Sequence, residues 1–144
     1  TLELIDKFKD KWDWKELSSN KSLPWSIEFI EKFENKWDWG FLSLNENLPW
    51  SEDLIEKYED KWDWNLLSFN KNLIWSEDLI EKYKNNWNWY NLSNNANFSL
   101  STKLIYKYFD KIVSSQHIWN TLKPFVDDEM VLELLKEIKL NKNE

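Results

Sequence analysis

One short sequence motif, which we name the phrase, occurs four times in the chain at a fixed period of 25 residues. Each copy reads Trp-x-Trp-x-x-Leu-Ser-x-Asn, and the copies begin at Trp12, Trp37, Trp62 and Trp87. A fixed period of about 20 to 50 residues is typical of a repeat array, in which each unit buries its apolar face on its neighbours. Thr1 occupies the place that Ser26 takes in the next unit. The period therefore constrains the fold more than any other feature does.

The first part of each unit is predicted to form a helix. In the third copy Ser51 is a good N-cap, and acidic residues follow in the first turn, where they complement the helix dipole. We expect this helix to run from Ser51 to about Lys61. Its apolar residues form one stripe of a 3.6-residue helix. The stripe consists of Trp50, Leu54, Ile55, Tyr58 and Trp62.

A second helix, of about seven residues, should begin inside the phrase. Asp13, Asp38, Asp63 and Asn88 stand where an N-cap is needed, and a Trp and a Leu follow on one face. We expect Trp14, Trp39, Trp64 and Trp89 to lie on the buried face. The helix should stop at Asn20, Asn45, Asn70 and Asn95. Gly adopts the left-handed conformation most readily, and Asn is the next most able residue type. We therefore predict left-handed helix ends there.

The repeat pattern decays after the fourth copy. Ile112 takes the place of a Trp, and a last apolar stripe from Met130 to Ile138 predicts a final helix. We predict tandem repeats over residues 1–115 and a capping segment over 116–144, in one continuous domain. Because the N-terminal unit has no comparable cap, we expect a fragment of a longer array.

These patterns predict an all-α fold, specifically a right-handed α-solenoid of about five 25-residue helix pairs with a C-terminal helical cap. The structural alternative is a leucine-rich β-solenoid, because the pattern L-x-x-N-x-x-L occurs at residues 17–23. The helical stripe argues against this alternative. So does the single Gly, because the tight turns of β folds use Gly.

The phrase resembles the short tryptophan-rich tandem repeats found in many giant-virus proteins and some bacteria. It stands here as Trp62-Asp63-Trp64-Asn65-Leu66-Leu67-Ser68-Phe69-Asn70 and continues to Trp75. The resemblance covers roughly residues 1–115. The chain departs from the viral versions in lacking Asn-Pro pairs, since Lys21, Glu46 and Lys71 follow the Asn residues. The resemblance implies a repeat protein and transfers no activity.

The charge of the chain bears on its partners. The formal net charge is −7 with 19 basic residues, all of them Lys. An acidic surface repels phosphates, so nucleic acid is the less favoured partner. We expect no membrane partner, because no apolar run approaches the about 18 residues that span a bilayer. Without Cys the compartment cannot be inferred from redox usage, and cytoplasmic is only a default. We expect a monomer or part of a longer chain.

Catalysis finds little support in the sequence. There is one His, no Cys and no Gly-rich phosphate loop, so we predict no enzyme, no metal and no cofactor. His117 is a candidate ligand or base, but packing is the favoured interpretation. Asp13, Asp38 and Asp63 could form a carboxylate row, but N-capping is favoured. The regular Trp residues could stack bases or sugars, but their phase with Leu favours the core.

The copies differ from one another on one face of the second helix, opposite its Trp and Leu. We name these residues the variable face. It consists of Lys15, Glu16 and Ser19, of Gly40, Phe41 and Leu44, of Asn65, Leu66 and Phe69, and of Tyr90, Asn91 and Asn94. Its middle members are more apolar than a solvated face should be. The alternative is that this helix is buried on both sides.

We therefore predict a non-enzymatic scaffold that binds a peptide or protein segment along the variable face, with Asn side chains adding hydrogen bonds. The predicted partner-binding residues are Lys15, Glu16, Phe41, Leu44, Asn65, Leu66, Phe69, Tyr90 and Asn91. The alternative is a modular single-stranded nucleic-acid-binding protein that reads one base per unit with Lys and Asn side chains.

Overall fold

All elements described by the computed structural model are α-helices, and no strand occurs among those residues. The structure describes residues 2–95, 97–98, 104, 107–112 and 136. The predicted all-α class is confirmed there. His117 and the predicted capping segment, Lys136 excepted, lie outside the described residues. The chain divides into two compact units, residues 1–88 and 89–144, which are described separately. The single continuous domain stays a prediction.

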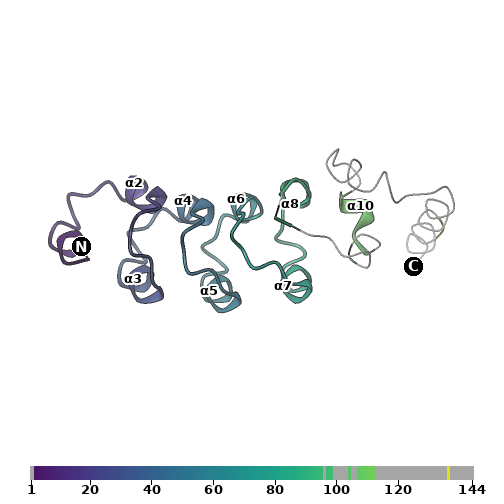
Figure 1. Cartoon of the computed structure of the whole chain (residues 1–144), viewed down its shortest axis with the longest axis horizontal. Coiled ribbons are helices and arrows are strands. Elements are labelled where there is room, and N and C mark those ends of the chain that lie inside the picture. The colour runs from purple at the N-terminus through teal and green to yellow at the C-terminus, as the bar shows by residue number, and fades with distance from the viewer. Residues whose placement is uncertain (1, 96, 99–103, 105–106, 113–135, 137–144) are drawn as a thin grey trace. The chain divides into compact units, whose positions relative to one another are not determined.

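The first unit arranges its helices in two rows (Figure 1). Helices α2, α4 and α6 form one row, in which α2 contacts α4 and α4 contacts α6. The other row is linked by ion pairs between successive helices. The first row is α2 (Trp14–Ser19), α4 (Trp39–Leu44) and α6 (Trp64–Leu67), and the second is α1 (Leu2–Lys7), α3 (Ile27–Lys32), α5 (Glu52–Lys57) and α7 (Glu77–Lys82).

The second unit contains two described helices, α8 (Trp89–Ser93) and α10 (Phe109–Ile112), which contact each other. The ring of Trp89 lies 4.3 Å from that of Tyr108. Leu92 and Ile112 are fully buried. With Leu104, which is also buried, an aromatic pair and three aliphatic side chains thus form the core of the described part of this unit.

The helices of the second row begin as predicted and end earlier. Ser51 Oγ accepts a hydrogen bond from the amide of Leu54 at 3.1 Å, which confirms the N-cap. The expected extension to Lys61 is wrong, because α5 ends at Lys57. In a longer helix the carbonyl of Ile55 would accept from the amide of Glu59. It accepts instead from Nε1 of Trp62 at 3.1 Å, so a side chain replaces the next helical bond.

The helices of the first row begin at their predicted caps. The carboxylates of Asp13, Asp38 and Asp63 accept main-chain hydrogen bonds from the first turn of α2, α4 and α6. The capping role of Asn88 stays a prediction. The left-handed helix ends are wrong: Asn20 and Asn45 have φ of −73° and −74°, and no described residue has positive φ. The extended backbone instead turns the Asn45 side chain toward the preceding unit, where it is bonded.

The core follows the predicted stripe. Leu54, Ile55 and Tyr58 are buried, and Leu42 and Leu67 are fully buried. The second Trp of each phrase is half-buried rather than fully buried. Its ring packs against aromatic residues that follow it in the chain. Trp39, for example, lies 4.7 Å from the ring of Tyr58 and 4.9 Å from that of Trp62. Most of the tryptophan surface is therefore used between units.

Candidate functional site

The Ser of each phrase is buried and joins two units. Ser43 Oγ donates to the carbonyl of Trp39 at 2.7 Å and accepts from the amide of Asp63 at 3.0 Å. Ser18 and Ser68 make the equivalent bonds. Sequence reasoning gave these serines no role, although an identical Ser in all four copies was a signal. The hydroxyl fixes the start of the next helix against the end of the previous one.

The Asn of each phrase also serves the junction between units. Asn45 and Asn70 are 2% and 1% exposed. Nδ2 of Asn70 donates to the carbonyl of Ser43 at 2.9 Å, and its Oδ1 accepts from the amide of Asn72 at 2.9 Å. From the sequence these two residues were predicted only to end the helices of the first row. Their amides are committed to the fold.

The variable face runs over three helices that contact in sequence, α2, α4 and α6, and its member Phe69 lies in the turn that follows the end of α6 at Leu67. Lys15, Glu16 and Asn65 are exposed on it. Leu44 is 41% and Phe69 is 44% exposed. Because these two side chains hold equivalent places on neighbouring repeats, they present apolar surface side by side. That the predicted residues act together as one binding surface stays a prediction.

Two predicted residues of this face are half-buried, because neighbouring units cover them. The ring of Phe41 has Lys15 Nζ 5.0 Å from its centroid. Leu66 lies against Gly40, where an added methyl group would be 3.7 Å from Leu66 Cδ1. Phe41 and Leu66 thus support the face as well as line it. In the second unit, Tyr90 is 60% exposed and Asn91 is half-buried.

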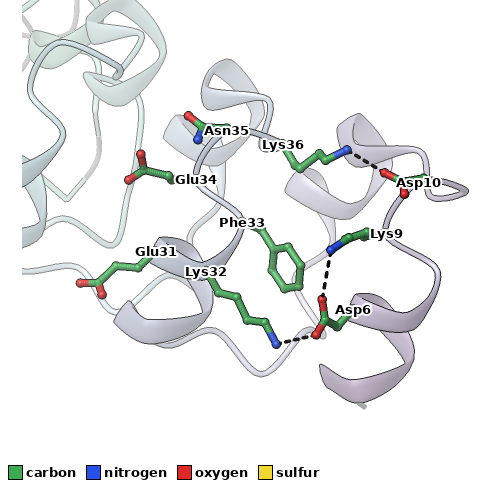
Figure 2. A pocket seen from close by; sticks show the side chains of 9 residues that line it. All are labelled: Asp6, Lys9, Asp10, Glu31, Lys32, Phe33, Glu34, Asn35 and Lys36. Carbon is green, nitrogen blue, oxygen red and sulfur yellow. Dashed lines mark hydrogen bonds and ion pairs between the residues drawn. The ribbon is translucent and has the colours of Figure 1, made fainter.

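The opposite row carries the charges. A cleft of about 390 Å³ lies between α1 and α3 and is lined by three lysines and four carboxylates (Figure 2). Lys32 Nζ contacts Asp6 at 2.9 Å, and Lys36 Nζ contacts Asp10 at 3.0 Å. The hydrogen bond from Lys32 holds the pKa of Asp6 below its usual range.

The charges of this cleft are paired with one another or with the next unit. Lys9 contacts Asp6 at 4.0 Å, while Glu31 pairs with Lys57 and Glu34 with Lys61. A binding or catalytic site needs charged groups that can turn to a ligand. Since each charged residue of the lining already has a partner, we interpret the cleft as a seam between two units.

Among the described residues, no group of three His, Cys, Asp or Glu side chains is placed to hold a metal ion. No helix in this part of the chain has both the length and the apolar composition that crossing a membrane requires. Comparison with known protein families, curated proteins and solved structures finds no match for the chain. The likeness to tryptophan-rich repeats therefore stays a prediction.

Proposed function

We propose that the chain is a non-enzymatic repeat scaffold that binds a peptide or protein segment along the variable face. The corresponding architecture is a right-handed α-solenoid of about five helix pairs with a C-terminal cap. Its support is the recurrence of the same contacts at successive junctions. The bond between the Ser hydroxyl and the amide of the next Asp or Asn, and the Trp contacts, each recur three times in the first unit.

The observation that carries this proposal is the exposure of Leu44 and Phe69 on neighbouring repeats. The other apolar residues of the second and third phrases are buried or half-buried, whereas these two differ between copies and face solvent. Fully burying one such side chain contributes about 1.5 to 3 kcal/mol. Lys15 and Glu16, exposed on the adjoining helix, supply charges of both signs at the edge of this apolar surface.

The spacing of the helices suggests what kind of segment fits. Helices packed side by side lie about 8 to 10 Å apart. A segment in the polyproline II conformation advances about 3.1 Å per residue with three residues per turn, so side chains three positions apart share one face about 9 Å apart. Two apolar side chains at this spacing would therefore reach Leu44 and Phe69 together. We propose a segment of this conformation and spacing as the ligand class.

The test is selection from a displayed peptide library. Peptides are selected on the unmodified chain and rescreened on the double variant Leu44→Ser/Phe69→Ser. The matched control is Ile27→Ser/Ile74→Ser, which removes two apolar side chains that are 38% and 65% exposed elsewhere. Selected peptides should carry the predicted spacing. They should no longer bind the Leu44/Phe69 variant and should still bind the control variant. Peptides that bind all three proteins alike would refute the placement.

The alternative candidate is a modular single-stranded nucleic-acid-binding protein. The exposed ring of Tyr90 and the exposed Lys15 favour it, because aromatic rings stack on bases and lysines contact phosphates. The net charge of −7 and the internal use of Asn45 and Asn70 disfavour it. A salt titration of oligonucleotide binding separates the two functions. Binding through phosphates must weaken steeply with salt, whereas apolar peptide binding should not.

A further inference from the structure

The first helix pair exposes apolar residues that are buried in every following pair of the first unit. Leu4, Phe8 and Trp12 are 48%, 36% and 37% exposed. Their equivalents in the third repeat, Leu54, Tyr58 and Trp62, are 1%, 4% and 5% exposed, and those of the second and fourth repeats are also buried. This difference defines an open apolar face on α1 and the turn that follows it.

The intact junctions show what covers such a face. At each junction a Trp from the preceding repeat packs on the two aromatic residues that are equivalent to Phe8 and Trp12. Trp14 lies 5.1 Å from Phe33 and 4.8 Å from Trp37. Trp64 lies 4.8 Å from both Tyr83 and Trp87. The missing cover of Phe8 and Trp12 is therefore an indole presented by another helix of this type.

The charges of the open face point to the same cover. Lys57 and Lys61 pair with Glu31 and Glu34 of the preceding unit. Their equivalents, Lys7 and Lys11, lie over the ring of Phe8 at 5.6 Å and 5.9 Å. Neither has a carboxylate within ion-pair distance in the described part of the chain. The face thus presents two cations where a neighbour would supply two anions.

The polar groups of the first phrase complete the pattern. At intact junctions the main-chain amide of the capping Asp donates to the hydroxyl of the preceding Ser, and the Asn side chain donates to the preceding Ser carbonyl. Asp13 and Asn20 hold these positions in the first repeat. Asn20 is exposed, whereas Asn45 is 2% exposed. The first phrase is therefore prepared for bonds that a further unit would make.

We propose that the face formed by Leu4, Lys7, Phe8, Lys11 and Trp12 is a docking surface for one further helix pair of the same Trp-x-Trp type. Such a partner supplies an indole for Phe8 and Trp12 and carboxylates for both lysines. A second copy of this chain fits less well, because its own open face would bring lysines against lysines. Its tryptophans at this position are covered already, since Trp14, Trp39 and Trp64 pack on the next repeat and Trp89 on Tyr108.

The test tethers one more repeat to the whole chain. A copy of residues 26–50 is joined directly before Thr1, which keeps the register because Thr1 aligns with Ser26. Tethering supplies the probe at a high effective concentration. Hydrogen–deuterium exchange of residues 2–12 should slow by about tenfold or more, and the melting temperature should rise. A tethered copy carrying Trp39→Ala and Glu31→Lys, which removes the indole and reverses one charge, should leave exchange unchanged.

Two results would overturn this proposal. One is unchanged exchange of residues 2–12 with the intact tethered repeat, which would show that the face does not accept such a unit. The other is concentration-dependent self-association of the unmodified chain that Leu4→Glu abolishes, which would make a second copy the occupant. Because Leu4 is exposed, its substitution leaves the core intact. Neither result depends on whether the variable face binds peptides.

Discussion

The side-chain amide of Asn45 donates a hydrogen bond of 2.9 Å to the main-chain carbonyl of Ser18, which lies 27 residues earlier. Oδ1 of the same side chain accepts from the amide of Asn47 at 3.0 Å. Asn70 repeats this arrangement one unit later. A single buried side chain thus closes a turn within its own unit and bonds the previous one. The last residue of the phrase contributes to the spacing between units.

Replacing this Asn should therefore weaken the fold. Asn45→Ala removes two good hydrogen bonds and leaves buried main-chain groups without partners, so we expect a loss of about 2 to 4 kcal/mol in the free energy of unfolding. The control is Asn20→Ala, because Asn20 is exposed and bonds no preceding unit. It should cost less than about 1 kcal/mol. Urea unfolding measures both, and equal losses would contradict the role given to Asn45.

The buried Ser residues allow a second matched comparison. Ser43→Ala removes the acceptor for the amide of Asp63, so we expect a loss of about 1 to 3 kcal/mol. Ser19→Ala, one residue after Ser18 on an exposed surface, removes only a bond to Glu16 within the same helix. Thermal unfolding of the two variants should place Ser43→Ala clearly lower. A reversed order would argue against the Ser bridge.

Two tryptophans of equal burial differ in one hydrogen bond. Trp62 is 5% and Trp87 is 4% exposed, but Nε1 of Trp62 donates to Ile55 whereas Nε1 of Trp87 has no partner among the described residues. Substitution by Phe removes the indole nitrogen at either position. We expect Trp62→Phe to lose about 1 kcal/mol more than Trp87→Phe in urea unfolding. Equal losses would mean that the indole bond does not stabilise the helix end.

Tyr58 carries a buried hydroxyl with no hydrogen-bond partner among the described residues. Phe33 holds the equivalent place one unit earlier. Because an unbonded buried hydroxyl costs free energy, Tyr58→Phe should keep the stability at neutral pH or raise it by about 1 kcal/mol. A loss of stability in urea unfolding at neutral pH would show that the hydroxyl has a partner.

The same variant should alter the pH dependence. Burial raises the pKa of the Tyr58 hydroxyl, so the folded state holds that proton more tightly than the unfolded state does. This tighter proton binding contributes fully to the free energy of unfolding below the ordinary tyrosine pKa of about 10. The contribution is lost as the pH rises through the pKa of the folded state. Stability of Tyr58→Phe should thus fall less between neutral pH and pH above about 10. Part of the decline in stability at high pH should remain in this variant, because the bond to Glu31 also raises the pKa of Lys57.

The helix starts could be predicted from the sequence, and the helix ends could not. Ser51 and Asp63 cap helices through bonds to residues three positions later, so residue type and local spacing suffice. The end of α5 depends on an indole from Trp62, and the extended conformation of Asn45 accompanies a bond to a carbonyl 27 residues away. A local preference for left-handed Asn does not decide a position that such a distant bond constrains.

The same limit applies to the candidate site. Helical periodicity placed Phe41 and Leu44 on one face, and both residues lie in α4. Which of them is open to a partner depends on the neighbouring unit, because the ammonium group of Lys15 lies over Phe41 while Leu44 stays 41% exposed. The variable positions could therefore be found from the sequence. Their division into supporting and exposed residues required the packing of adjacent helices.

The most direct test of the proposed scaffold function is the Kd of a library-selected peptide, measured by calorimetry. We predict that Leu44→Ser/Phe69→Ser weakens binding at least about tenfold, which corresponds to about 1.4 kcal/mol. Ile27→Ser/Ile74→Ser should change the Kd by less than about twofold, because these exposed residues are not members of the variable face. An unchanged Kd for the Leu44/Phe69 variant, with its helicity intact, would contradict binding at the variable face.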